Sequence, residues 1–206
     1  MHPNPNFRKT ETQISLEFAR KRAFGSLVIS ANPVPLISHI PFLLAEDGSS
    51  AVLHLVRSNP ITRLKEPSPA KILVTGADAY ISPDWYGEDD HVPTWNYVAV
   101  HLTGVLEPLP PEDLPDVLAA QSDDYETRLL PKPVWKMDKL NDEVQARFLR
   151  MILPYRFRVE DIDSTWKLGQ NKDDTVRRAA ADQVETGIGS ELAELAALMA
   201  NPPQTS

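Results

Sequence analysis

Alternating apolar and polar positions are the main pattern along this chain, and they predict a protein built mostly from short β-strands. The alternating runs are rich in β-branched and aromatic residues, and turn-forming residues separate several of them. The runs lie at residues 24–30, 37–44, 51–56, 69–75, 79–82 and 95–106. Six short strands at nearly regular spacing predict an antiparallel β-barrel.

Helical spacing of apolar residues appears before, between and after these strands. The predicted helices are Thr12–Arg22, a helix that opens at Pro110–Asp113, Asn141–Ile152, Asp173–Thr186 and Ser190–Met199. Pro154 is expected to end the third helix, and the clean alternation of Tyr155–Ile162 predicts a last strand. The predicted fold class is therefore α+β, a β-barrel with peripheral helices.

The composition narrows the class of protein. The net charge is −8 and the pI is about 5.1, which argues against binding nucleic acid through the overall field of the protein. The chain has no cysteine, so disulfides, thiolate metal sites and thiol nucleophiles are excluded. Residues 1–10 are polar, and no window approaches 18 apolar residues, so neither a signal peptide nor a membrane span is expected. We expect a cytoplasmic protein.

Catalytic and metal-binding signatures are missing from the sequence. There is no phosphate loop, dinucleotide fingerprint, zinc-protease motif or hydrolase elbow, and the five histidines are scattered. No metal site is predicted for that reason. His39 is the best histidine for contacting a ligand, because Pro41 cannot donate to a strand ladder and therefore distorts the same strand.

The stretch Ala79–His101 concentrates aromatic residues. It holds two of the four tryptophans and three of the five tyrosines, around the loop Pro83–Pro93. Hairpin loops usually have 2–5 residues, so a loop of this length favours a functional role. Amphipathic rings at this place suit a flat, partly polar ligand, and they equally suit a cap on one end of a barrel core. Both interpretations stay open.

A second candidate site surrounds Asn59 and Pro60. Asparagine followed by proline predicts the cap and first position of a helix. The free N–H groups of a helix start, with Arg57 and Ser58 beside them, predict a phosphate cradle. An ordinary capped turn explains the same residues.

Four motifs carry a further signal. They are Ser38–Leu44 (SHIPFLL), Leu55–Pro60 (LVRSNP), Ala79–Tyr86 (AYISPDWY) with Val92–Tyr97 (VPTWNY), and Trp166–Lys172 (WKLGQNK). Together they resemble the PaiB-type FMN-binding negative transcriptional regulators. The resemblance implies a six-stranded antiparallel split barrel related to pyridoxine-phosphate oxidases, a homodimer, and FMN at the subunit interface. The implied domains are an FMN-binding domain at 1–172 and a C-terminal helical extension at 173–206.

The resemblance also implies roles for individual residues. Those along the isoalloxazine, offering backbone groups to its polar edge, would be His39, Ile40 and Pro41. Those on the phosphate would be Arg57, Ser58 and Asn59. Those coming across the dimer interface would be Trp95 and Asn96.

The last motif would close the site with amide and ammonium donors, from Gln170, Asn171 and Lys172. Gly169 stands where serine is expected, and Lys172 stands where arginine is usual. The second difference keeps the charge but loses bidentate geometry.

Three functions follow from these observations. The first is a flavin-binding regulatory protein, and the second is an FMN-dependent oxidoreductase of a small or pyridoxal-like substrate. Flavin chemistry is carried by the cofactor, so the lack of a catalytic triad does not separate them. The third, a sequence-specific DNA-binding repressor, is disfavoured because there is no helix-turn-helix or basic recognition helix.

Overall fold

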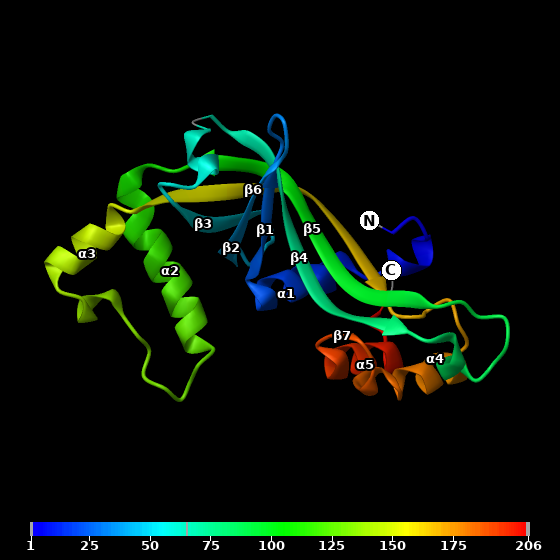
Figure 1. Ribbon diagram of the computed structural model, residues 1–206. Coiled ribbons are helices and arrows are strands. Elements are labelled where there is room, and N and C mark those ends of the chain that lie inside the picture. The colour runs from blue at the N-terminus through cyan, green and yellow to red at the C-terminus, as the bar shows by residue number, and fades with distance from the viewer. Residues whose placement is uncertain (1, 65, 205–206) are drawn as a thin grey trace. The chain divides into compact units, whose positions relative to one another are not determined.

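The computed structural model describes residues 2–64 and 66–204. The chain forms two compact units, whose elements are labelled in Figure 1. We call Met1–Phe18, Val74–His101 and Ile162–Ser206 the terminal unit, and Ala19–Leu73 and Leu102–Asp161 the middle unit. Strands β4, β5 and β6 each contribute residues to both units.

One sheet contains all seven described strands. They are β1 (Phe24–Ile29), β2 (Leu36–Leu44), β3 (Ser50–Val56), β4 (Ser68–Ile81), β5 (Thr94–Pro108), β6 (Ile152–Lys167) and β7 (Gly189–Ser190). Their order is β1-β2-β3-β6-β5-β4-β7, and β1 also pairs with β4, so the first six strands close a ring. The pairs β1–β2, β1–β4, β2–β3 and β3–β6 are antiparallel. The predicted six-stranded antiparallel fold with peripheral helices is confirmed.

The helices occupy the predicted places along the chain. The α-helices are α1 (Thr12–Arg22), α2 (Leu114–Thr127), α3 (Asp142–Leu149), α4 (Asp174–Ala181) and α5 (Leu192–Ala200). The 3₁₀ helices are η1 (Pro5–Phe7), η2 (Pro60–Arg63), η3 (Pro83–Tyr86), η4 (Pro111–Asp113), η5 (Met137–Lys139) and η6 (Val184–Thr186). In the described part of the chain, no helix combines the length and apolar character needed to cross a membrane.

The runs predicted as a fourth and a fifth strand are one continuous strand, β4. The predicted runs leave residues 76–78 outside both strands, but Gly76 lies within β4 and marks a close approach. A Cβ atom on Gly76 would lie 2.6 Å from Cζ of Phe18 and 3.1 Å from Cβ of Val98. The strand therefore runs on through Gly76 because only a residue without a side chain fits beneath the Phe18 ring.

The prediction that Pro154 ends a helix is also wrong. Helix α3 ends at Leu149, and Pro154 lies inside β6, opposite His54 of β3. The Arg57 N–H donates to the carbonyl of Met151 (2.8 Å), which sets the alternation of this antiparallel ladder. The backbone of Pro154 therefore points away from β3, and the ladder between β3 and β6 needs no N–H from this residue.

Each unit has its own buried side chains. In the middle unit, Phe42, Leu53 and Phe157 are fully buried on alternating strand positions. In the terminal unit, Trp166 and Leu168 belong to a cluster packed with residues of α4 and α5.

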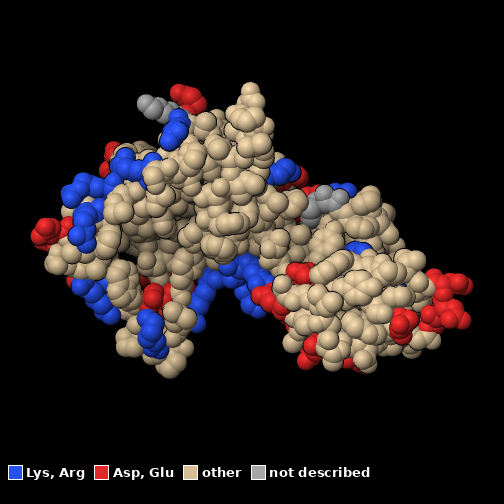
Figure 2. Space-filling model, viewed as in Figure 1, with Lys and Arg blue, Asp and Glu red and all other residues tan. Residues whose placement is uncertain are grey.

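All of the net charge belongs to the terminal unit. Its sequence has fourteen acidic residues and six lysines and arginines, whereas the middle unit has fifteen of each. Figure 2 shows Asp and Glu side chains gathered at one end of the terminal unit.

Candidate functional site

The first half of β2 has a free edge. The Phe42 N–H donates to the carbonyl of Ala23 (2.9 Å), which fixes the alternation of the ladder with β1. The odd-numbered residues of β2, including His39 and Pro41, therefore turn their backbone groups to the opposite edge. On that side, β3 pairs with β2 only at Phe42–Leu44. Among the described residues, the backbone of His39 thus has no ladder partner, whereas Pro41 lies next to Phe42, where the ladder with β3 begins.

The side chains of this segment face two environments. Ile40 is buried in the core, whereas His39 is exposed. The Nδ1 atom of His39 lies 3.0 Å from Oγ of Ser26, and its ring stacks on Phe24 with centroids 6.5 Å apart. Because Phe24 is itself 58% exposed, the two rings form an exposed aromatic surface next to the free edge.

The segment after β3 is organised by Asn59. Its Oδ1 accepts a hydrogen bond from the Ile61 N–H (3.0 Å) and caps η2, while its Nδ2 donates to Oγ of Ser38 (2.9 Å). The predicted cap and proline start are confirmed, but the helix is a 3₁₀ helix of four residues. Asn59 thereby ties this turn to the free part of β2.

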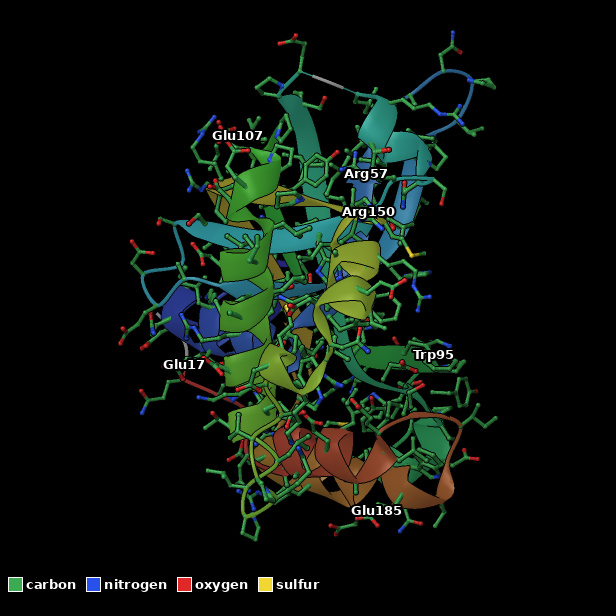
Figure 3. All side chains as sticks on the ribbon, turned by 90° about the vertical axis from the view of Figure 1, so that its left-hand side faces the viewer. Glu17, Arg57, Trp95, Glu107, Arg150 and Glu185 are labelled. Atoms are coloured by element: carbon green, nitrogen blue, oxygen red, sulfur yellow. The ribbon has the colours of Figure 1, made fainter. Side chains whose placement is uncertain are left out.

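Arg57 is held in place by backbone groups. Its Nε donates to the carbonyl of Arg150 (2.7 Å), and both residues are labelled in Figure 3. Its own carbonyl accepts from Oγ1 of Thr62 (2.9 Å). The two terminal guanidinium nitrogens have no partner in the described residues, and Arg57 and Ser58 are both exposed. This arrangement leaves a positioned pair of donors that suits phosphate oxygens.

The remaining predicted residues belong to the terminal unit. On β5, Asn96 is buried and its Nδ2 donates to Sδ of Met199 (3.3 Å). Trp95, labelled in Figure 3, is 46% exposed and meets Tyr80 edge to face, with centroids 6.4 Å apart. Because Trp95 and Asn96 are adjacent on a strand, the side chain of Asn96 lies inside the unit and that of Trp95 lies in solvent.

Gln170 uses both ends of its amide inside its own loop. Its Oε1 accepts from the Leu168 N–H (2.8 Å), and its Nε2 donates to the carbonyl of Trp166 (2.5 Å). Asn171 is exposed and Lys172 is half-buried. The role of Gln170 as a donor to FMN stays a prediction.

The terminal unit contains a pocket of about 290 Å³. Its lining residues are His2, Asn4, Phe7, Tyr86, Asp90, His91, Val92, Thr94, Asn96, Lys167, Gly169, Asn171 and Lys172. Of the predicted residues in this unit, Asn96, Asn171 and Lys172 therefore meet in one place, and Trp95 and Gln170 do not line it.

The sequence interpretation missed two groups of this pocket. His91 stands in the acidic loop, and its Nδ1 lies 2.8 Å from Nζ of Lys172. Lys167 donates to Oγ1 of Thr94, and burial lowers the pKa of its ammonium group. Lys167 and Thr94 both lie within the quoted motifs. The motifs therefore contained these two residues, but the predicted contacts were assigned to the neighbouring aromatic and amide residues.

The middle-unit residues fit a phosphorylated flavin. The backbone N–H and carbonyl of His39 on the free edge of β2 suit the polar edge of a flavin ring, and the positioned donors of Arg57 with the Ser58 hydroxyl suit a phosphate. The fold and this site together define the class of split-barrel flavin-binding proteins.

Comparisons with known proteins give the family. Residues 1–161 match the family of FMN-binding domains called FMN_bind_2, and the chain belongs to this PaiB-type FMN-binding family, whose cofactor is a flavin. It is 29% identical over 196 residues to the protease synthase and sporulation protein PAI 2 of Bacillus subtilis, and the match covers 94% of this chain and 93% of that protein.

Solved structures support the same fold. The flavocytochrome Anf3 from Azotobacter vinelandii superposes with a TM-score of 0.59 at 13% identity, over 82% of this chain and 73% of that one. The FAD and heme binding protein from Mycobacterium smegmatis gives 0.57 at 16% identity, over 81% and 76%. At these identities the likeness shows the fold.

Proposed function

We propose that this protein is a PaiB-type regulatory protein that works as a homodimer and holds FMN at the subunit interface. The observation that carries the proposal is the conjunction of a free strand edge at His39 with the guanidinium of Arg57. Asn59 links the two through its hydrogen bond to Ser38 (2.9 Å). When bound, FMN supplies redox chemistry, and the protein supplies binding and orientation.

The roles of the terminal-unit residues follow from the family resemblance. Trp95 and Asn96 of a second copy would meet the flavin of the first, and Gln170, Asn171 and Lys172 would close the site. The exposure of Trp95 (46%) and of Phe24 (58%) supports this, because large exposed aromatic side chains are enriched at interfaces between proteins.

The first test is FMN titration of the full chain, followed by visible absorption and by light scattering on a sizing column. We expect a flavin spectrum, close to one FMN per chain, and the mass of a dimer. Arg57→Ala should weaken FMN affinity by about 1.5–3 kcal/mol, roughly 10- to 150-fold, because a charge-assisted bond is lost. Arg63→Ala, an exposed arginine of η2, is the matched control. Equal affinity in both variants would place the phosphate elsewhere, and a colourless monomer would overturn the proposal.

The regulatory role needs a separate measurement. With a net charge of −8, we expect the protein to act without binding DNA directly. Filter binding to its own upstream DNA at moderate salt should show no sequence-dependent retention. Steady oxidation of a nicotinamide donor by the FMN-loaded protein would favour the oxidoreductase function instead.

A further inference from the structure

The pocket of the terminal unit contains two lysines without a carboxylate partner. Lys167 donates to Oγ1 of Thr94, and Nζ of Lys172 lies 2.8 Å from Nδ1 of His91. Among the described residues, neither ammonium group forms a salt bridge, although the unit has fourteen acidic residues. The one carboxylate that lines the pocket belongs to Asp90, which is exposed.

Aromatic rings hold both ammonium groups in place. Nζ of Lys167 lies 5.9 Å from the ring centroid of Phe7, and Nζ of Lys172 lies 5.2 Å from that of Tyr86. A ring face attracts a cation but offers no lone pair for its N–H groups. Because both lysines are half-buried, their charges are positioned but only partly compensated.

His91 adds a donor that lacks an acceptor. Since its Nδ1 accepts from Lys172, a neutral imidazole carries its proton on Nε2. That atom is buried and has no hydrogen-bond partner in the described structure; Oε2 of Glu88 lies 3.5 Å away. A buried N–H without an acceptor, beside two ammonium groups, is a donor set for an oxyanion.

We propose that this pocket binds a compact oxyanion, the carboxylate or phosphate group of a small molecule, through Lys167 and Lys172 with Nε2 of His91 as the third donor. A volume of about 290 Å³ suits a small ligand, or one end of a larger one. The inference rests on the side chains of the terminal unit and does not need the proposed flavin contacts of the middle unit.

The test is a titration of the full chain with sodium phosphate, at ionic strength held constant with sodium chloride. Amide NMR should show saturable shifts at Gly169, Asn171 and Lys172, which line the pocket. Lys167→Met and Lys172→Met should each weaken phosphate at least tenfold, while Lys172→Arg should retain most of the affinity. Lys139→Met, which removes an exposed charge from the middle unit, should leave it unchanged. Thermal unfolding of each variant shows that it is folded.

Repeating the titration with saturating FMN distinguishes two sources of the anion. Phosphate binding that persists would assign the pocket to a second ligand, and loss of phosphate binding would assign it to the phosphate of FMN itself. Both results support an oxyanion site. Absence of saturable shifts in the unsubstituted chain, or equal affinity in the methionine variants, would overturn it. Flavin binding is read separately from the visible spectrum, so the two proposals fail independently.

Discussion

The two candidate regions present their polar groups in different ways. In the middle unit, the groups are backbone atoms on a strand edge, and Arg57 is fixed by the carbonyl of Arg150. In the terminal unit, they are the side chains of Lys167, Lys172 and His91, positioned by rings and short loops. A backbone edge tolerates side-chain substitution, whereas a side-chain pocket does not. Substitution in the middle-unit site should therefore matter mainly at Arg57, whereas each of the three side chains of the terminal pocket should matter.

The two units also differ in net charge. The middle unit is neutral overall, and the terminal unit carries the whole charge of −8. Even so, the acidic unit is the one with two unpaired lysines in a pocket. A net charge therefore describes long-range attraction, while nearby groups decide what a particular pocket binds.

Substituting glycines tests how tightly each unit is packed, and it should give the largest effect. A Cβ atom on Gly104 of β5 would lie 1.9 Å from the carbonyl oxygen of Arg158, so Gly104→Val must force the strands of the middle unit apart. We expect it to cost about 3 kcal/mol or more, measured by urea unfolding.

Gly87 of the terminal unit is the matched control. No atom lies within 4 Å of a Cβ there, but its φ of +69° disfavours a side chain. Gly87→Ala should cost only about 1 kcal/mol. Equal losses in the two variants would contradict the contrast in packing.

Much of the middle unit could be predicted from the sequence, because local pattern and fold agree there. The alternation placed β1, β2 and β3 to within a residue, and Asn59 with Pro60 gave the turn. In the terminal unit, the separation of the runs at 69–75 and 79–82 was wrong, because Gly76 is set by the ring of Phe18, which is distant in sequence. Close approach between distant segments leaves no periodic signal.

The terminal pocket could be predicted only in part. Asn171 and Lys172 were found through a motif. His91 lies eighty-one residues from Lys172, and no local sequence pattern indicates that the two side chains are in contact. The neighbours of His91 in sequence include Glu88, Asp89 and Asp90, which give no sign of a cationic pocket. A cationic pocket inside an acidic unit is a product of tertiary structure, so neither composition nor spacing could predict it.

A buried hydroxyl pair offers the next largest effect, and it lies in the terminal unit. Ser15 accepts a hydrogen bond from Nε1 of Trp166 (3.1 Å) and donates to Oγ of Ser164 (2.9 Å), with all three residues buried. Ser15→Ala should cost about 1–3 kcal/mol, because it leaves the buried indole N–H of Trp166 without a hydrogen-bond acceptor. In a Trp166→Phe background the same change should cost less, and a double-mutant cycle without coupling would show that the hydrogen bond contributes nothing.

Tyr125 of the middle unit should make stability fall at alkaline pH. Its hydroxyl donates to the carbonyl of Phe42 (2.9 Å), and burial raises the pKa of Tyr125 to about 12. Between pH 10 and that value the folded protein keeps a proton that the unfolded chain loses, so stability decreases by at most about 1.4 kcal/mol per pH unit. Tyr125→Phe should cost about 0.5–1.5 kcal/mol at neutral pH and flatten the alkaline decline in urea unfolding. An unchanged decline would assign it to another group.

Lys167 should act in the opposite direction and give the smallest effect. Burial lowers the pKa of Lys167 below its ordinary value of 10.5, so at pH values between the two the unfolded chain holds the extra proton. Stability then rises with pH through that window, and Lys167→Met should remove the rise while changing stability at pH 7 by less than about 1 kcal/mol. Lys139→Met, on an exposed residue, should leave the rise in place.

Because a ligand that binds only the folded state stabilises it, phosphate should raise the melting temperature of the unsubstituted chain more than that of Lys167→Met. Equal increases would mean that the half-buried Lys167 contributes to packing and not to anion binding.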